Sequence, residues 1–280
     1  ADTCHGTQAG VPALIEILQR HDASGTFFFS LGPDHSGRET RSSSLSRFYD
    51  LRTRLYGRLL PGPDIGRRCT EIMRQTDGAG FETGIHAWDR AGWDKRILQA
   101  ENPWVEAELA KACARFADVF GDTAKAHGAS GWRMNRHALR LTQRLGFSYA
   151  SDCRGSHPFI PVFDGEIVAC PQIPTTLPTL DEILAMEPGF APDQAADRIL
   201  QLSGAIAGDH VFTLRAELEG MKFSSALERL LSGWKTRDFQ LVALRDIRAS
   251  LDIKELPRHT VHFAEAAGRP GKRLTQGSVF

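Results

Sequence analysis

The chain has 280 residues, which suits one large domain or two small ones, and the α/β barrel is among the few single-domain folds that use this length fully. Its 34 basic and 34 acidic side chains cancel, which argues against a general nucleic-acid partner. No apolar run approaches the roughly 18 residues needed to cross a bilayer, so we expect no membrane-spanning segment. Five scattered cysteines without a CxxC pair predict neither disulfides nor a thiolate zinc site, and they favour a reducing compartment, the cytoplasm.

The N-terminal part of the chain alternates between helical and strand patterns. Residues 11–20 (VPALIEILQR) have the apolar spacing of a helix, and residues 26–32 (TFFFSLG) form a continuous apolar run typical of a strand buried on both faces. Another helix is predicted over residues 64–75, and the strand pattern FETGI then leads directly into His86.

A basic segment, residues 38–60, lies between the first strand and the next helix. Its apolar side chains recur every three or four positions beside an arginine-rich face, which predicts an amphipathic helix. Two interpretations remain open: the helix lies on anionic lipid, or it packs on the domain as an ordinary solvated helix. The six arginines of the segment are residues 38, 41, 47, 52, 54 and 58.

The rest of the chain continues the alternation. A long helix is predicted to begin at Asn102 and Pro103 and to end at Gly121. Strands and helices at this spacing predict a parallel sheet with helices outside it. A barrel is favoured over an open doubly wound sheet by the length of the chain, and no GxGxxG or GxxxxGK[ST] phosphate loop is present. Short strands are predicted at residues 130–133, 147–151, 166–170, 210–215 and 239–243.

Polar residues gather where these strands end, which is where chemistry sits in parallel α/β folds. Carboxylates and a histidine at the ends of different strands suit a shared metal or acid–base site. Three of them also have a simpler interpretation: Asp2 as a helix cap, Asp152 as a turn residue and His86 as a core histidine. Trp88, which lies near His86 in the sequence, can equally be explained by core packing. The set comprises Asp2, His5, His86, Asp89, Arg133, Asp152, Arg154, Arg215 and Glu217.

Several long stretches, DTCHGTQAGVPALIEIL, GIHAWDRAGW, SDCRGSHPF, PQIPTTLPTLDEIL and TLRAELEG, resemble the polysaccharide deacetylase (NodB-homology) family. Within it they are most similar to the deformylases of lipid A aminoarabinose modification. The resemblance implies a distorted (β/α)7 barrel, a single domain over residues 1–280, with its first strand largely missing from this chain. It also implies a metal-dependent amide hydrolase that removes formate from 4-formamido-arabinose carried by undecaprenyl phosphate. Such a protein is expected in the cytoplasm, peripheral on the inner membrane.

The resemblance also implies roles for individual residues. Asp2 and His86 match metal ligands of the family, for a divalent ion that we expect to be zinc, with manganese or cobalt as alternatives. Arg133 matches the arginine that orients the catalytic base, and Asp152 with Arg154 matches a motif that supports the site. The catalytic residues implied are Arg133, Asp152 and Arg215, and the substrate-binding residues are Trp88, Arg154 and Glu217.

Two arginines depart from the family pattern. Arg90 stands where the second metal histidine belongs, Arg215 stands where the acid histidine belongs, and the base aspartate would precede Ala1. A guanidinium has no lone pair for a metal and keeps its proton at neutral pH. His5 or Asp89 could replace the lost ligand. The alternative function is a non-catalytic binder of the lipid-linked sugar, or of an anion, with the two arginines in a cationic cleft.

Overall fold

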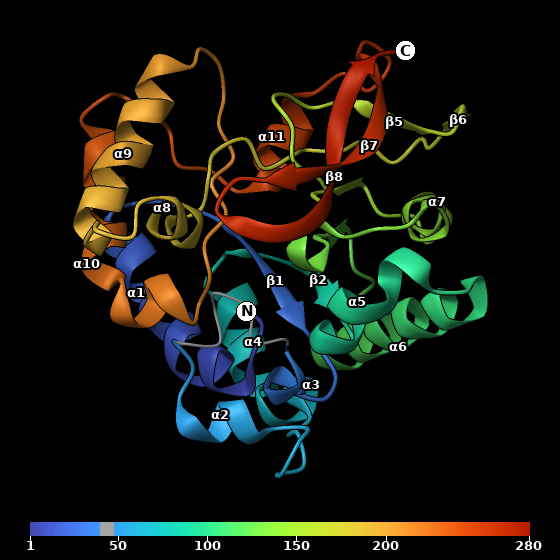
Figure 1. Cartoon of the computed structure of the whole chain (residues 1–280), viewed down its shortest axis with the longest axis horizontal. Helices are drawn as coiled ribbons and strands as arrows, with labels where there is room; N and C mark the ends of the chain where they lie inside the picture. The colour runs from blue at the N-terminus through green and yellow to red at the C-terminus, as the bar shows by residue number, and fades with distance from the viewer. Residues whose placement is uncertain (40–47) are drawn as a thin grey trace.

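The computed structural model describes residues 1–39 and 48–280, and Figure 1 shows helices arranged around a small set of central strands. Four strands form a parallel sheet in the order β1-β2-β3-β4. They are β1 (Thr26–Ser30), β2 (Glu82–Ala87), β3 (Ala126–His127) and β4 (Tyr149–Ala150). Because the strands are parallel, their carboxyl ends meet at one edge of the sheet, where the residues after each strand come together.

A second sheet has the order β6-β5-β7-β8. Strands β7 and β8 form a long antiparallel hairpin, and β5 runs parallel to β7. In Figure 1 this hairpin lies at one end of the molecule and carries the C-terminus. Its strands are β5 (Ile160–Phe163), β6 (Glu166–Ile167), β7 (Arg258–Ala266) and β8 (Arg269–Val279).

Helices surround the parallel sheet, with α9 and α10 on one side and α6 and α7 on the other (Figure 1). The first six are α1 (Val11–Arg20), α2 (Leu51–Leu55), α3 (Ile65–Arg68), α4 (Thr70–Gly78), α5 (Arg90–Arg96) and α6 (Asn102–Phe120). The others are α7 (Arg136–Arg144), α8 (Leu180–Met186), α9 (Pro192–Ala205), α10 (Ser224–Lys235) and α11 (Leu244–Ser250). Among the helices of the described chain, none combines the length and apolar character needed to cross a membrane.

Local sequence signals explain where the main helices begin and end. Helix α6 has a proline in its first turn and ends at Gly121, whose φ of 76° is the left-handed conformation that glycine adopts without strain. Helix α8 begins at a capping box, in which Thr179 and Glu182 satisfy each other's backbone N–H groups. These signals lie in the sequence itself, so the corresponding boundaries could be predicted.

Several predicted elements are confirmed and others are not. The helices at residues 11–20 and 102–120 and the strands at β1, β2 and β4 are present. The predicted helix 64–75 is two helices, α3 and α4, which are separated at Cys69. Residues 130–133 were expected to be a strand but form a 3₁₀ turn, because the pairing strand is β3, fully buried between β2 and β4.

The basic segment is not one continuous helix. Helix α2 begins at Asp50, whose carboxylate accepts the Thr53 backbone N–H at 3.0 Å, and it ends at Leu55. Tyr56 is extended and Gly57 has a φ of 79°, so the prediction of one helix over 38–60 is wrong within the described residues. The part of that prediction on residues 40–47 lies outside the described residues.

Closure of the sheet into a seven-stranded barrel stays a prediction. Residues 210–215 and 239–243 were expected to be strands, but neither segment forms a regular strand ladder in the described chain. They are tied to the rest by single backbone bonds, such as the Thr176 N–H to the Val211 carbonyl at 3.1 Å and the Ser24 N–H to the Leu241 carbonyl at 2.8 Å. The strand predicted at 166–170 is present only as the short β6.

Candidate active site

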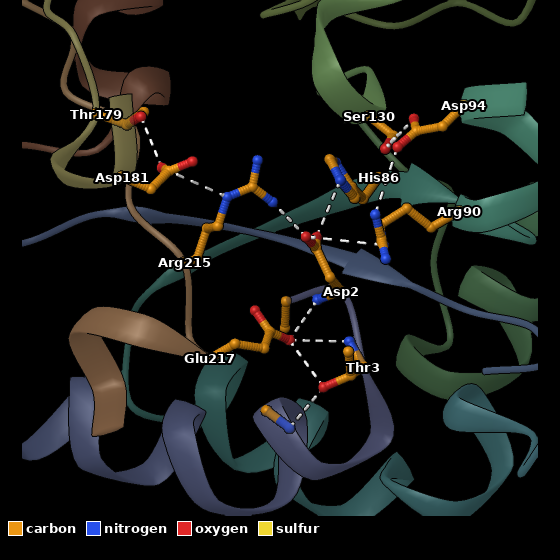
Figure 2. Close-up of polar contacts among 12 residues, drawn as sticks. Asp2, Thr3, His86, Arg90, Asp94, Ser130, Thr179, Asp181, Arg215 and Glu217 are labelled. Carbon is orange, nitrogen blue, oxygen red and sulfur yellow. Dashed lines mark hydrogen bonds and ion pairs between the residues drawn. The ribbon is translucent and has the colours of Figure 1, made fainter. Parts of the chain in front are cut away.

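Asp2 is the centre of the polar residues at the strand ends (Figure 2). The Ala1 nitrogen donates to the Phe28 carbonyl at 2.7 Å, and the Ser30 N–H donates to the Ala1 carbonyl at 3.1 Å, so Ala1 runs beside β1. Glu217 then accepts the Asp2 backbone N–H at 2.8 Å. These contacts place the Asp2 side chain at the carboxyl end of β1, where it is only 5% exposed.

The Glu217 side chain is buried and binds the backbone at Asp2. The same Oε1 atom accepts the Thr3 N–H at 2.9 Å and the Thr3 hydroxyl at 3.1 Å. Gly6 lies directly against this carboxylate, and a Cβ atom there would come within 2.1 Å of Oε1. Glu217 therefore positions Asp2, and its expected contact with substrate stays a prediction.

Three side chains converge on the Asp2 carboxylate (Figure 2). Arg215 donates to Oδ2 through Nη1, and the Arg90 Nε lies 3.8 Å from the same oxygen. The His86 Nε2 lies 3.2 Å from Oδ1. The sequence prediction that Asp2, His86, Arg90 and Arg215 share one site thus agrees with their positions in the structure.

The two guanidinium groups determine the charge state of Asp2. Burial raises the pKa of Asp2, but the nearby charges of Arg215 and Arg90 outweigh it and hold this pKa well below its usual value. For Arg215, burial lowers the pKa, and the carboxylates of Asp2 and Asp181 more than compensate, so the pKa is raised. Asp2 and Arg215 are therefore a mutually stabilised ion pair.

Both arginines have further carboxylate partners. Arg90 hydrogen-bonds Glu39, and its Nη1 lies 3.4 Å from an oxygen of Asp94. The Arg215 Nε lies 4.0 Å from Asp181, which in turn accepts a hydrogen bond from Arg269 at 2.5 Å. The positive charges expected for a cationic cleft are thus already balanced by acidic side chains, which weakens the interpretation of the site as an open anion clamp.

These acidic partners and Arg269 were not assigned roles from the sequence. Asp94 lies one helical turn after Arg90 on α5, whereas Glu39 is 51 positions from Arg90. Asp181 comes from α8, and Arg269 comes from the β7–β8 hairpin. The stretch PQIPTTLPTLDEIL, which contains Asp181, carried a signal because it belongs to the family resemblance.

His86 has a fixed orientation. Its Nδ1 lies 2.6 Å from the Gly128 carbonyl, which can only accept, so Nδ1 carries the proton. Its Nε2 is buried, faces Asp2 and has no hydrogen-bond partner. When His86 carries a second proton, that proton lies between the two side chains.

The residues present do not fit the catalytic divalent ion implied by the resemblance. Asp2 and His86 supply two donors, whereas catalytic zinc sites use three protein ligands. Within residues 1–39 and 48–280, no three His, Cys, Asp or Glu side chains are grouped to hold an ion. Arg90 occupies the third position, and Arg215 already neutralises the carboxylate. No hydrolytic step is therefore derived through a metal.

The replacement ligands considered from the sequence are engaged elsewhere or point elsewhere. Asp89 caps α5 by accepting the Gly92 N–H at 3.0 Å, and its other oxygen lies 2.8 Å from the His35 Nδ1. His5 lies near Asp50, whose pKa is lowered against the effect of burial mainly by hydrogen bonds with Thr53. Neither residue contacts Asp2 among the contacts of the described chain.

Asp152 forms a second, separate carboxylate–histidine pair. Its Oδ1 accepts from the His127 Nδ1 at 2.7 Å and from the Ala129 N–H at 2.8 Å, and its own N–H donates to Gln172 at 3.0 Å. Asp152 is fully buried and His127 nearly so. The sequence did not identify His127, because a single histidine in AHGAS carries no ligand spacing. The pair supports the ends of β3 and β4.

The other predicted site residues lie around this centre. The Arg133 Nη1 donates to the Asp94 carbonyl at 2.7 Å. Arg154 pairs with Glu182 at 3.2 Å and lies over the ring of Trp132, 4.8 Å from its centroid. Trp88 packs against Gly32, and the Arg115 guanidinium lies 5.3 Å from its ring. Their catalytic and substrate-binding roles stay predictions.

A cavity of about 750 Å³ opens beside the site. Asp2, His86 and Arg215 line its polar end. The cavity runs along β1, which is an edge strand of the first sheet. Its other walls are largely apolar and include Leu14, Phe28, Leu227, Leu231 and Trp234. The polar groups of the site thus form one end of a mainly apolar space.

Comparison with solved structures defines the class of fold. A polysaccharide deacetylase from Mycobacterium smegmatis superposes with a TM-score of 0.67 at 19% identity, over 94% of this chain and 83% of that one. A family 4 acetyl xylan esterase from Clostridium thermocellum, solved with a cobalt ion, has a TM-score of 0.53 at 13% identity, over 88% of each chain. A CE4 family pseudoenzyme from Bacillus anthracis has a TM-score of 0.54 at 12% identity, over 92% and 66%. The chain has the α/β fold of the polysaccharide deacetylases.

Sequence relatives define the family. A 4-deoxy-4-formamido-L-arabinose-phosphoundecaprenol deformylase, ArnD, from Shewanella sediminis is 34% identical over 99% of this chain and 93% of its own length. A protein of the same name from Wigglesworthia glossinidia brevipalpis is 29% identical over 95% and 96%. No family model matches the chain. The chain belongs to the ArnD deformylase family.

Proposed function

We propose that the protein is an amide hydrolase of the deformylase class, acting on 4-formamido-arabinose carried by undecaprenyl phosphate, with residues 1–280 as one domain. The observation that carries this proposal is the identity of 34% to a protein named for that reaction, over nearly the full length of both chains. The strand-end residues Asp2, His86, Arg133 and Asp152 support it, because the resemblance implies a role for each of them in the active site. We expect the sugar to meet the polar end of the cavity.

A second candidate is a non-catalytic binder of the same lipid-linked sugar. The specific observation in its favour is the contact of Arg215 with Asp2, which occupies the carboxylate that a hydrolytic ion would need. Our prediction of zinc, with manganese or cobalt as alternatives, is therefore best examined in the Arg90→His/Arg215→His variant, where both expected histidines are present. Cobalt in one enzyme of this fold supports a divalent ion for the class in general.

One experiment distinguishes the two candidates. The purified protein is incubated with the formamido-sugar lipid in detergent micelles, and released formate and bound lipid are both measured. Formate release that is lost in Asp2→Asn, and kept in the surface control Asp197→Asn, supports the hydrolase. Lipid binding without formate release contradicts the hydrolase and supports the non-catalytic binder. Neither binding nor release overturns both.

We also propose that the protein meets the cytoplasmic face of an anionic membrane through residues 48–60. Leu51 and Leu59 are 72% and 79% exposed, and the exposed arginines Arg52 and Arg58 lie beside them in the sequence. Exposed apolar side chains next to basic ones suit the surface of anionic lipid. We expect sedimentation with phosphatidylglycerol vesicles at low salt, and less of it in Leu59→Asp than in the control Leu145→Asp. Equal sedimentation of the two variants contradicts the proposal.

A further inference from the structure

Two histidines from distant parts of the chain meet outside the site at Asp2. His157 lies in the loop between β4 and β5, and His259 lies in β7. Their Nε2 atoms are 3.2 Å apart, and the rings cross at 73°. His157 is exposed, whereas His259 is 7% exposed. His157 therefore lies on the solvent side of the pair, and His259 lies on the side of the hairpin.

The hydrogen bond made by His259 determines which nitrogen carries its proton. Its Nδ1 lies 2.9 Å from the Gly277 backbone carbonyl. A carbonyl oxygen only accepts, so Nδ1 must be the donor. Neutral His259 therefore presents a lone pair at Nε2, toward His157.

The side chain of Gln276 determines which ring nitrogen of His157 carries the proton. The Ser156 backbone N–H donates to the Gln276 Oε1 at 2.7 Å, which fixes the orientation of the amide. The amide nitrogen then faces the His157 Nε2 at 3.2 Å. Because an amide nitrogen only donates, the His157 Nε2 must accept, and its hydrogen is on Nδ1, 2.8 Å from the Ser156 hydroxyl. The single lone pair of the His157 Nε2 thus accepts from Gln276, and the lone pair of the His259 Nε2 lies 3.2 Å from the same atom.

A cation that displaces the Gln276 N–H from the His157 Nε2 would bind both lone pairs. We propose that His157 and His259 form a binding site for a divalent transition-metal ion of the zinc, nickel and copper group, completed by water. Imidazole nitrogens are ligands that these ions prefer. Bonds of about 2.0–2.1 Å place two ligand atoms roughly 2.9–3.4 Å apart at angles between square and tetrahedral. The observed 3.2 Å lies within this range.

The surroundings of the two rings match those of metal-binding histidines. Such histidines usually donate their second ring N–H to a backbone carbonyl or another oxygen, which fixes the ring. Gly277 and Ser156 supply these oxygens here.

A bound ion would fasten the loop after β4 to the hairpin. That loop already pairs with β8, because the Arg154 N–H donates to the Leu274 carbonyl at 2.9 Å and the Gln276 N–H donates to the Arg154 carbonyl at 2.8 Å. The ion would add a connection from His157, three residues after Arg154, to His259 in β7. The segment that carries Arg154 would thereby be held against β8.

The test is calorimetric titration of tag-free, EDTA-treated protein with Ni²⁺ and with Zn²⁺. We expect one ion per chain, and a loss of affinity of roughly tenfold or more in His157→Ala and in His259→Gln, since each removes one of two protein ligands. His157 is exposed, so its variant should fold even if the change at buried His259 does not.

Two control variants locate the ion. His262→Ala removes an exposed imidazole from the other face of β7 and should keep the wild-type affinity. His86→Gln should also keep it, because the ion lies away from Asp2. The proposal is overturned if wild type binds no ion, if His157→Ala binds like wild type, or if His86→Gln abolishes binding.

Discussion

The Asp2–His86 pair and the His157–His259 pair each place a histidine Nε2 atom 3.2 Å from a second atom that can bind a cation. In both pairs a backbone carbonyl fixes the ring, Gly128 at 2.6 Å for His86 and Gly277 at 2.9 Å for His259. Their surroundings differ. Arg215 and Arg90 adjoin the first pair, whereas Ser156 and Gln276 adjoin the second.

The difference shows that donor geometry alone does not predict a metal site. Near Asp2 the positive charge is supplied by the protein itself. The Arg215 guanidinium binds the Asp2 carboxylate, and the Arg90 Nε lies 3.8 Å from it. A divalent ion brought there would be repelled by two fixed charges in a poorly solvated place. At the histidine pair the neighbouring groups are neutral, so the cation must come from solution.

The largest expected effect on stability comes from removing the Arg215 guanidinium. Arg215→Ala leaves the Asp2 and Asp181 carboxylates buried without this partner, and we expect the free energy of unfolding to fall by about 3–5 kcal/mol. Urea denaturation measures it. The control is Arg229→Ala, which breaks an exposed pair with Asp197 and should change the stability little. Equal losses in the two variants would contradict the role given to Arg215.

A comparable loss is expected at the other carboxylate–histidine pair. Asp152→Ala leaves the His127 Nδ1 and the Ala129 N–H buried without an acceptor, at a cost of about 1–3 kcal/mol for each group. Asp152→Asn keeps an acceptor oxygen and should lose less, by the same urea measurement. A loss in Asp152→Asn as large as in Asp152→Ala would mean that the charge, and not the hydrogen bonding, stabilises this pair.

The pH dependence of stability tests the protonation of buried Glu219 beside Arg215. Burial raises its pKa from 4.5 to about 8, while its carboxylate accepts the Arg215 N–H at 2.8 Å. The folded protein therefore binds a proton that the unfolded chain releases above about pH 4.5, and the associated stability is lost as the pH rises to about 8. Glu219→Gln should become more stable relative to wild type between pH 5 and 8.5. The exposed variant Glu187→Gln is the control, and parallel curves for all three proteins would contradict the assignment.

Asp2 has the opposite pH dependence. Its pKa is held well below 3.8, so the stability it contributes is present above that value and is lost as the pH falls through the folded-state pKa. Asp2→Asn should weaken the acid-induced loss of stability below about pH 4. Thermal melts at pH 2 to 5 measure this, and an unchanged acid limb in the variant would contradict the ion pair.

Much of the architecture could be predicted from the sequence, because it is written in local patterns. The apolar run of β1 and the proline and glycine at the ends of α6 are examples. The convergence of Asp2 and His86 could also be predicted, since parallel strands end at one edge. The strand predicted at 130–133 failed because SGWR has the apolar character of a strand but begins after β3 has already ended at His127.

What decides the chemistry could not be predicted in the same way. Among the carboxylates around Arg90 and Arg215, only Asp94 lies at a helical spacing, one turn after Arg90. Glu39 and Asp181 come from other segments of the chain, and no periodicity predicts their contacts. The protonation of His157 and His259 depends on Gln276 and Gly277 in β8, a strand that the sequence patterns did not reveal. Charge balance and proton positions are properties of the folded chain.

The most direct measurement is the metal content, by elemental analysis, of EDTA-treated and then zinc-loaded His157→Ala/His259→Ala, in which only the Asp2 centre is left to bind an ion. We predict less than a tenth of an ion per chain, and about one ion per chain once Arg90→His/Arg215→His is added, because three protein ligands then surround the site. Near-UV circular dichroism confirms that each variant is folded. A stoichiometric ion held with both arginines in place, and lost on Asp2→Asn, would contradict the claim that Arg215 takes the place of the metal.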